Sequence, residues 1–467
     1  CFCCKRFYKS NLFFINNYIY INRNIILKIS GWGKYPLKDT EVLNPKNLEE
    51  LKKIIKLGKI VARGNGRSYG DSSVGLLRTI NMKNFNNIIS FDQKNGVLTA
   101  EAGVLLKDII NKILPNGWFP FVTPGTKFVT LGGLIAADVH GKNHHKDGNF
   151  SNYVEWFDLI NSKGEILRCS KDENTEIFEW TLGGMGLTGI IIKAAIRLRP
   201  IKTAWIKQKI ITKKNLDETI DLFEKNETST YSVAWIDCLE KKKNFIGRSV
   251  LILGEHAKID DLDTKKKAKP FDTPNKINLT VPLNFPSWFL NAWFVKIFNS
   301  LYYWKNKKDN KIKLIDWNSY FYPLDKLLEW NKIYGKKGFA QFQCVIPINN
   351  SRKGINELLK AVRESEVGSF LSVLKKLGPE KGKFSFPLNG FTLALDFPIN
   401  EKTLILMEKL DKITSKYNGR IYLAKDSRMS RETLEKTEKR LKDFYNFRKN
   451  NQNVKTFASS QSTRLGL

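Results

Sequence analysis

Hydrophobic and polar residues follow two different periods along this chain. Apolar residues recur every three or four positions at 46–57 and 104–113, which predicts amphipathic helices. Strands are expected where apolar residues alternate with polar ones or run together, at residues 59–62, 87–91, 96–101, 154–170, 339–347 and 390–398. A further strand at 419–428 is expected to end in a polar turn that carries Lys425. The mixture of both periods indicates an α+β protein.

Three glycine-rich turns stand out among these elements. They are RGNGRSYGD at 63–71, FVTPGTKFVTLGG at 121–133 and LGGMGLTG at 182–189. Glycine is favoured where the backbone takes positive φ or where a ligand approaches closely. No GxxxxGK[ST] motif is present, and the first turn lacks the third glycine of GxGxxG. The turns therefore predict one binding site assembled from several loops, whose backbone N–H groups face a diphosphate.

Length and composition indicate a folded protein of more than one domain. A chain of 467 residues is too long for one ordinary hydrophobic core. A hydrophobic content of 42% and an aromatic content of 12% exclude a disordered, collagen-like or coiled-coil chain. Glycine becomes rarer after Pro200, which places a domain boundary near residues 200–206.

The net charge of the chain is strongly positive. Lys and Arg exceed Asp and Glu by 32, which favours an anionic partner such as nucleic acid, an acidic lipid surface or a phosphorylated substrate. A general compositional bias is the alternative interpretation. Lysine clusters at 241–243, 265–267 and 305–313 lie after the expected domain boundary.

An aromatic stretch at 285–308 lies between two of these clusters. Its apolar residues follow helical spacing: Leu290, Trp293, Phe294, Ile297, Phe298, Leu301 and Trp304. Trp and Tyr beside lysines are typical of a helix at a membrane interface. An ordinary core helix, with Asn291, Lys296 and Asn299 on its solvated face, fits the pattern equally well. Both interpretations stay open.

The cysteines, histidines and amino-terminal residues indicate no metal or disulfide site. Six Cys are scattered without a CxxC pair. His140, His144 and His145 lie close together, but no carboxylate or Cys recurs at a spacing suited to a metal. Residues 11–29 are interrupted too often by polar residues to span a membrane. We expect residues 1–30 to form an N-terminal extension, with targeting or tethering as the alternative.

Several motifs resemble the vanillyl-alcohol oxidase superfamily of flavoproteins. ARGNGRSYGD, PGTKFVTLGGLIAADVHGKNHH and LGGMGLTGIIIKAAIRLRP are similar to its FAD-binding domain. Within the superfamily, DVHGKNHHKDGNFSNYV, FYPLDKLLEWNKIYG, FAQFQCVIP, SVLKKLGP and YLAKDSR resemble the family of decaprenylphosphoryl-β-D-ribose 2′-oxidases. The resemblance runs from about Gly31 to the carboxyl end.

The resemblance implies a two-domain α+β flavoprotein. A PCMH-type FAD-binding domain would comprise residues 31–204, and an antiparallel-sheet substrate-binding domain would comprise residues 205–418. Residues 419–467 would form a C-terminal segment that returns to the FAD domain.

The resemblance also implies the residues of the site. Those expected to contact FAD are Ala62, Arg63, Gly64, Asn65, Gly66, Arg67, Ser68, Tyr69, Gly70, Asp71, Ser72, Gly125, Thr130, Leu131, Gly132, Gly133, Ala137, Asp138, Val139, His140, Ile191 and Tyr422. Those expected to contact substrate are Gln341, Gln343, Thr392, Ala394 and Lys425. Catalytic roles would fall to Lys425, His140 and Tyr422. The base for the sugar hydroxyl is either His140 or Lys425, and the sequence does not choose between them.

Three positions depart from the pattern of the relatives. Tyr69 stands where many relatives attach FAD through a histidine, so the flavin is expected to be non-covalent. Ala394 stands where mycobacterial-type oxidases carry a pocket cysteine, so the thiol that covalent inhibitors exploit is absent. Thr392 replaces the Asn that is usual in the family, which bears on substrate recognition.

The activity implied by the resemblance is oxidation of the C2 hydroxyl of a polyprenyl-phosphate-linked ribofuranose to the 2′-keto sugar. This would be the first half of an epimerisation to the arabinose form in cell-envelope polysaccharide precursor synthesis. A companion NADH-dependent short-chain reductase would complete it. The lysine clusters suggest a peripheral anionic membrane surface as a further partner. The protein would be cytoplasmic or peripheral at the inner membrane, with the periplasmic side left open.

Two other functions compete with this one. One is an FAD-dependent oxidase of a soluble alditol or aldonolactone. The other is a non-catalytic basic protein that binds nucleic acid or membrane. No RNA-binding or helix-turn-helix motif accompanies the glycine loops, so no nucleic-acid partner is expected.

Overall fold

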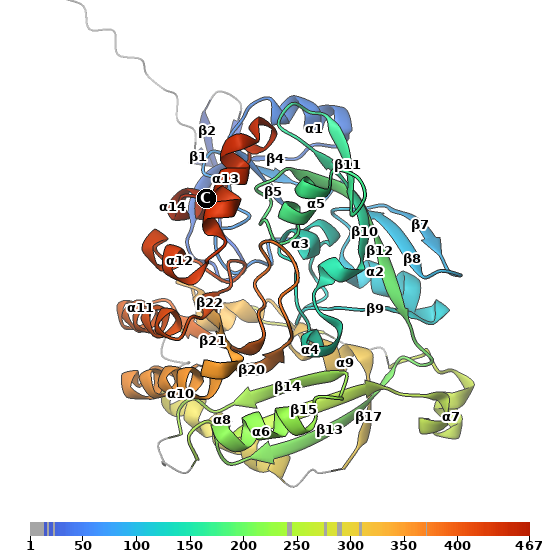
Figure 1. Ribbon diagram of the computed structural model, residues 1–467, viewed down its shortest axis with the longest axis vertical. Coiled ribbons are helices and arrows are strands. Elements are labelled where there is room, and N and C mark those ends of the chain that lie inside the picture. The colour runs from blue at the N-terminus through green and yellow to red at the C-terminus, as the bar shows by residue number, and fades with distance from the viewer. Residues whose placement is uncertain are drawn as a thin grey trace, which may run out of the picture.

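The computed structural model shows three large β-sheets with helices packed against them (Figure 1). It describes residues 14–15, 18–21, 24–240, 245–274, 278–286, 292–307, 311–369 and 371–467. The mixture of helices with mainly antiparallel strands confirms the predicted α+β fold class. Within the described residues, none of the helices is both long enough and apolar enough to cross a membrane.

The first sheet contains the N-terminal strands and leads into the first glycine turn. Its strands, in spatial order, are β1 (Phe14–Ile15), β2 (Tyr18–Ile21), β3 (Asn24–Ile29), β4 (Lys38–Leu43), β6 (Arg78–Asn81) and β5 (Ile60–Arg63). Helix α1 (Leu48–Ile55) begins after Asn47, whose side chain accepts a hydrogen bond from the Glu50 N–H. Strand β3 pairs with β4, so part of the expected extension is built into this sheet. Residues 1–13 lie outside the described residues.

The second sheet carries the other glycine-rich segments. Its strands are β11 (Ile166–Ser170), β10 (Val154–Ile160), β12 (Ile190–Pro200), β8 (Val97–Glu101) and β7 (Ile88–Asp92), and β9 (Trp118–Pro120) also pairs with β12. The accompanying helices are α2 (Leu106–Ile113), α3 (Leu131–Ala136), α4 (His144–Asp147) and α5 (Thr175–Thr181). Leu98, Ile109 and Phe157 are fully buried in the hydrophobic core between them.

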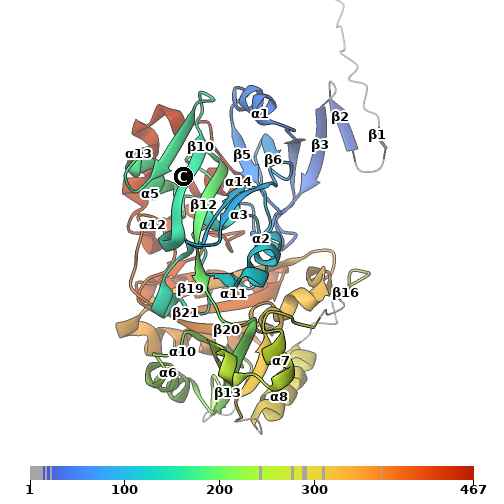
Figure 2. The same cartoon turned by 90° about the vertical axis from the view of Figure 1, so that its right-hand side faces the viewer.

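The third sheet forms the lower body of the molecule in both ribbon views (Figure 2). Its strands are β17 (Lys313–Asp316), β13 (Trp205–Lys213), β15 (Ser249–His256), β14 (Tyr231–Ile236), β20 (Ser372–Leu377), β21 (Gly390–Pro398), β19 (Phe339–Pro347) and β22 (Arg420–Ile421). Two short strands, β16 (Leu279–Thr280) and β18 (Leu327–Leu328), pair separately. The helices are α6 (Leu216–Lys225), α7 (Thr264–Ala268), α8 (Ala292–Lys307), α9 (Trp317–Phe321), α10 (Ile348–Ser365) and α11 (Glu401–Lys416). The strands predicted at 339–347 and 390–398 are β19 and β21.

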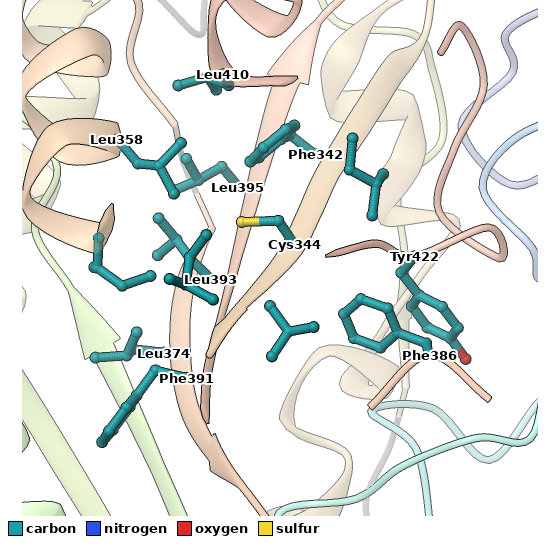
Figure 3. Packing of buried hydrophobic residues seen from close by; sticks show 14 of the residues in the cluster. Phe342, Cys344, Leu358, Leu374, Phe386, Phe391, Leu393, Leu395, Leu410 and Tyr422 are labelled. Atoms are coloured by element: carbon teal, nitrogen blue, oxygen red, sulfur yellow. The ribbon is translucent and has the colours of Figure 1, made fainter. Parts of the chain in front are cut away.

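Strand β19 in the third sheet separates an apolar face from a polar one. On β19, Phe342 and Cys344 are buried in a core that includes Leu358 of α10 (Figure 3). Gln341 and Gln343 alternate with them and therefore point to the opposite face, where they line a cavity. Helices α10 and α11 thus cover one side of the sheet, and the cavity lies on the other side.

The C-terminal segment returns from the third sheet to the first (Figure 1). After β22, which is shorter than the strand expected at 419–428, come α12 (Arg431–Thr437), α13 (Leu441–Asn450) and α14 (Ser460–Leu465). The Ala458 N–H donates to the Ile60 carbonyl at 2.9 Å, and the Tyr69 N–H donates to the Ala424 carbonyl at 3.0 Å. These hydrogen bonds attach the end of the chain to β5 and to the first glycine turn.

Helix α8 buries Asn299 and Tyr303 and exposes several apolar residues. Asn299 is only 1% exposed, and its amide donates to Asp237 at 2.8 Å. Leu301 is 67% exposed and Trp304 is 51% exposed. The expectation that Asn299 lies on a solvated face is therefore wrong, because its bond to Asp237 holds it inside the fold, whereas Lys296 is exposed as expected. Leu290, Asn291, Trp293, Phe294, Phe298 and the cluster at 241–243 lie outside the described side chains.

Candidate active site

A cavity of about 550 Å³ lies where the glycine-rich loops meet the polar face of the third sheet. Its volume falls within the range of roughly 300–1,000 Å³ that is usual for ligand and cofactor sites. All three glycine-rich segments contribute to its lining, together with residues of β14, β19, β20 and β21. Tyr422 and Lys425 reach it from the C-terminal segment. The fold therefore gathers distant parts of the chain around one space.

Most of the residues expected from the sequence line this cavity. They are Ala62, Gly64, Asn65, Gly66, Arg67, Ser68, Tyr69, Ser72, Gly125, Thr130, Gly132, Gly133, Ala137, Val139, His140, Ile191, Gln341, Gln343, Ala394, Tyr422 and Lys425. Those that do not line it are Arg63, Gly70, Asp71, Leu131, Asp138 and Thr392.

Gly70 and Asp71 hold the C-terminal segment against the first glycine turn. A Cβ atom on Gly70 would lie 1.9 Å from the Asp426 carbonyl oxygen, so a side chain does not fit there. The Asp71 carboxylate accepts a hydrogen bond from Arg464 at 2.8 Å. These two residues therefore support the loop and lie behind its cavity side.

The other residues outside the lining also support the walls. Leu131 is fully buried in the hydrophobic core of the second sheet. The Arg63 guanidinium donates to the Ser30 carbonyl at 2.8 Å. The buried Asp138 carboxylate accepts several hydrogen bonds inside the fold. The Thr392 hydroxyl accepts a hydrogen bond from Gln343 Nε2 at 3.2 Å, so Thr392 acts on the cavity through the orientation of Gln343.

The glycine loops fit FAD because glycine lets their backbones pack closely around the cavity. A Cβ atom on Gly64 would lie 2.1 Å from Thr130 Oγ1, and Gly66 has a φ of +62°, which favours glycine. Arg67 stacks on Trp32, with 3.9 Å between the guanidinium carbon and the ring centre. Elsewhere in the turn 64–73 the lining residues are uncharged. Backbone N–H groups of such loops suit the diphosphate of a bound FAD.

Lys425 lies beside the Tyr69 ring and close to a buried carboxylate. Its Nζ is 3.6 Å from the centre of that ring. Gln341 Nε2 donates to the Asp396 carboxylate, and the two residues face each other across β19 and β21. Burial lowers the pKa of Lys425, and the negative charge of Asp396 offsets part of that effect. Burial also raises the pKa of Asp396, so both groups exchange protons closer to neutral pH than they do in water.

His140 lies next to Gln343 on the cavity wall. The two Nε2 atoms are 3.2 Å apart, and the imidazole ring is 5.2 Å from the Tyr422 ring. Burial lowers the pKa of His140 well below its usual value, and Lys375 adds to this effect. The imidazole is therefore neutral at pH 7. Across the described residues, no group of three His, Cys, Asp or Glu side chains is placed to hold a metal ion.

Sequence reasoning misses three charged residues of this region: Lys142, Lys375 and Asp396. Lys142 and Lys375 line the cavity, and Asp396 lies beside it. In β21, Asp396 is two residues after Ala394, and in β20, Lys375 pairs with Thr392. Residues two apart in a strand share a face. The alternation of apolar and polar residues in β20 and β21 is therefore the sequence signal that could have located these residues.

Comparison with known proteins identifies the class of this chain. The profile of an FAD binding domain matches residues 40–170. The chain is 34% identical over 457 residues to decaprenylphosphoryl-beta-D-ribose oxidase of Mycolicibacterium smegmatis, covering 94% of this chain and 97% of that protein. It is 26% identical over 374 residues to an uncharacterised protein of Streptomyces coelicolor, covering 78% and 100%. It is 30% identical over 194 residues to cytokinin dehydrogenase 5 of Arabidopsis thaliana, covering 38% and 35%.

The fold, the glycine cradle and these similarities define an FAD-dependent oxidoreductase with a PCMH-type FAD-binding domain. The chain belongs to the family of decaprenylphosphoryl-β-D-ribose oxidases. The expected family and the expected FAD cofactor are thereby confirmed, and a non-catalytic binding protein is excluded.

Proposed function

We propose that this chain oxidises the C2 hydroxyl of a polyprenylphosphoryl-β-D-ribofuranose to the 2′-keto sugar. The main support is its similarity, over almost the full length of both chains, to an oxidase named for decaprenylphosphoryl ribose. The cavity adds support, because it joins the FAD cradle to a polar wall with Gln341, Gln343 and Lys425. Bound FAD supplies the acceptor for the hydride that leaves C2. An NADH-dependent short-chain reductase then completes epimerisation to the arabinose form in cell-envelope polysaccharide precursor synthesis.

Lys425 is the base that takes the proton of the C2 hydroxyl. A base works best when its pKa lies near the working pH, and burial moves the pKa of Lys425 in that direction. The neutral amine accepts the O–H proton while the C2–H bond gives up its hydride. Asp396 then stabilises the ammonium that forms, since its carboxylate favours the charged state of Lys425.

His140 and Tyr422 position the sugar beside Lys425. The low pKa of His140 makes its imidazole a weaker base than the Lys425 amine. With its neighbour Gln343 it offers hydrogen bonds that orient the hydroxyl groups of the ribose. The Tyr422 hydroxyl donates to the Ala137 carbonyl at 3.2 Å, which fixes the ring against the end of helix α3.

Ala394 and Thr392 set this site apart from that of the mycobacterial-type oxidases. Ala394 lines the cavity opposite Gln343, and its methyl group offers no nucleophile. Inhibitors that need a thiol at this position therefore have nothing to attack. Thr392 orients Gln343 by accepting its hydrogen bond. The threonine hydroxyl thus takes the place of the asparagine amide that is usual in the family.

FAD is bound without a covalent link at Tyr69. The tyrosine is buried, and its ring packs on Phe339 with 5.3 Å between centres. We expect acid precipitation of the purified holoenzyme to release the flavin into the supernatant, because no histidine stands at this position. Absorbance near 450 nm, compared between supernatant and washed pellet, measures the release. A pellet that stays yellow would show covalent attachment, for which His140 is the first residue to test.

The proposed substrate is tested by anaerobic reduction of the flavin. Farnesylphosphoryl-β-D-ribofuranose should bleach the flavin absorbance, because its C2 hydride passes to FAD. Adding the short-chain reductase with NADH should then consume the keto product and yield the arabinose form. Simple alditols and aldonolactones serve as comparison substrates. Bleaching by those compounds alone would assign the chain to the oxidases of soluble sugars.

The role of Lys425 predicts a dependence of flavin reduction on pH. At saturating substrate, the rate should rise with pH as the ammonium loses its proton, with a midpoint below the usual lysine pKa of about 10.4. Asp396→Asn removes the charge that favours the ammonium, so the midpoint should move to lower pH. Lys425→Met should retain FAD and lose about 100-fold or more in rate.

The control is Lys376→Met. Lys376 lies in β20, next to the strand that carries Asp396, and points away from the cavity. The variant should leave the pH profile unchanged. A midpoint that moves to higher pH in Asp396→Asn would contradict the assignment of Lys425 as the base.

We propose that helix α8 binds an anionic membrane surface. Its exposed Leu301 and Trp304 lie near Lys305 and Lys307, and Lys307 Nζ is 4.5 Å from the centre of the Trp304 ring. Each lysine near an anionic leaflet contributes on the order of 1 kcal/mol to binding. Tyr302 of the same helix lines the cavity. A lipid-linked substrate would therefore enter the cavity beside the surface that binds the membrane.

Vesicle binding tests this surface. The double variant Leu301→Ser/Trp304→Ser should lose most of its co-sedimentation with vesicles that contain phosphatidylglycerol. The matched control, Ile405→Ser, changes a residue that is 61% exposed on α11. It should sediment like the unaltered enzyme. Equal sedimentation of both variants would remove α8 from the interface.

A further inference from the structure

Two lysines of the cavity have no acidic partner among the described residues. Lys375 lies in β20 in the middle of the third sheet, and Lys142 follows the second glycine loop. Lys142 Nζ donates to the Tyr320 carbonyl and lies 4.3 Å from the centre of the Tyr320 ring. Within the part of the chain that the structure describes, neither lysine forms a salt bridge with a carboxylate.

The next residue of the same strand shows the contrast. Lys376 points to the other face of β20 and pairs with Glu227 at 2.9 Å. Burial lowers the pKa of Lys375 to about 8, and burial together with Lys375 lowers the pKa of Lys142 to about 7. Asp396, the nearby carboxylate, acts on Lys425. Two cations held in a cavity without a counter-ion are costly unless an anionic ligand joins them.

The position of Lys375 separates it from the FAD diphosphate loop. Tyr69 of that loop packs on Phe339 of β19, whereas β20 is the second strand away from β19, beyond β21. Adjacent strands are about 4.8 Å apart, so roughly 10 Å separate the two strands. The anion held by Lys375 is therefore a different group from the FAD diphosphate.

The cavity wall changes character in one direction across the sheet. Gln341 and Gln343 of β19 come first, with Ala394 of β21 beside Gln343. Lys375 follows on β20, and Trp235 of β14, which pairs with Val373 of β20, comes next. Ile252 of β15 and Tyr302 of α8 continue the wall beyond Trp235 with apolar and aromatic surface. The sequence of polar, cationic and apolar surface matches the order of sugar, phosphate and isoprenoid in a polyprenylphosphoryl sugar.

We propose that Lys142 and Lys375 form an anion subsite that binds the phosphodiester between the sugar and the polyprenyl chain. The inference rests on the proposed function, because it assumes that the substrate carries this group. The subsite fixes the distance from the phosphate to the ribose and so presents C2 to Lys425. The isoprenoid leaves it along Trp235 toward α8.

Calorimetric titration of the oxidised holoenzyme tests the subsite without turnover. The probes are geranyl phosphate, geraniol and inorganic phosphate. Lys375→Met should weaken geranyl phosphate binding on the order of 10-fold or more, since one charge-assisted hydrogen bond is lost. Geraniol binding should stay unchanged, and Lys375→Arg should restore part of the affinity for geranyl phosphate. Lys376→Met is the matched control and should bind all probes like the unaltered enzyme.

The three probes distinguish an anion subsite from a packing defect and from a site for free phosphate. An equal loss of geraniol binding in Lys375→Met would show a packing defect and overturn the proposal, as would unchanged geranyl phosphate binding. Inorganic phosphate that binds as tightly as geranyl phosphate would overturn the lipid-linked ligand in favour of a soluble phosphoryl sugar. Lys142→Met, measured in the same way, should weaken geranyl phosphate binding and spare geraniol.

Kinetics with farnesylphosphoryl-β-D-ribofuranose separate this proposal from the proposed function. In Lys375→Met, KM should rise by the factor found for geranyl phosphate, and this change should exceed any change in kcat. Flavin bleaching with an unchanged KM would leave the function standing and refute the subsite. Lysine-dependent binding of geranyl phosphate without bleaching by the ribose compound would refute the substrate and support the subsite.

Discussion

Arg464 donates hydrogen bonds to Asp71 in the first glycine turn and to Asp426 in the C-terminal segment, at 2.8 and 3.0 Å. These bonds hold together two parts of the chain that are far apart in sequence. In the same place the Tyr69 N–H donates to the Ala424 carbonyl. The C-terminal segment is also paired with β19, since β22 extends the third sheet. This attachment therefore joins the first glycine turn to the third sheet, and the geometry of the cavity between them depends on it.

The third sheet meets two opposite demands through alternation along its strands. In β20, Leu374 belongs to the core beneath α10 and α11, while Lys375 faces the cavity. In β21, Leu395 is buried in that core, while Asp396 faces the side of Gln341. A register shift of one residue would put charged groups into the core and leucines into the site. The apolar packing in Figure 3 thus fixes the positions of the chemical groups on the other face.

Local patterns in the sequence predict most of the fold and part of the site. The glycine turns and the strands at 339–347 and 390–398 are local features, and they lie where the pattern predicts. Lys375 was missed because a Lys-Lys pair reads as a solvated surface, and only pairing with β21 reveals its direction. Helix α8 was ambiguous for a similar reason. The burial of Asn299 depends on its bond to Asp237 in a distant part of the chain.

The charge excess of 32 divides into parts with different physical meaning. Lysines on the surface are solvated, and salt screens the repulsion between them. Most of them therefore have little effect on the stability of the fold. Lys375 and Lys142 differ, because the protein holds them in a cavity where no described carboxylate bonds to them. Burying these ammonium groups without a counter-ion costs free energy, and a bound anion would offset that cost. Under the functions proposed above, the strongly basic composition matters mainly at these few internal positions and along α8, where anions would bind.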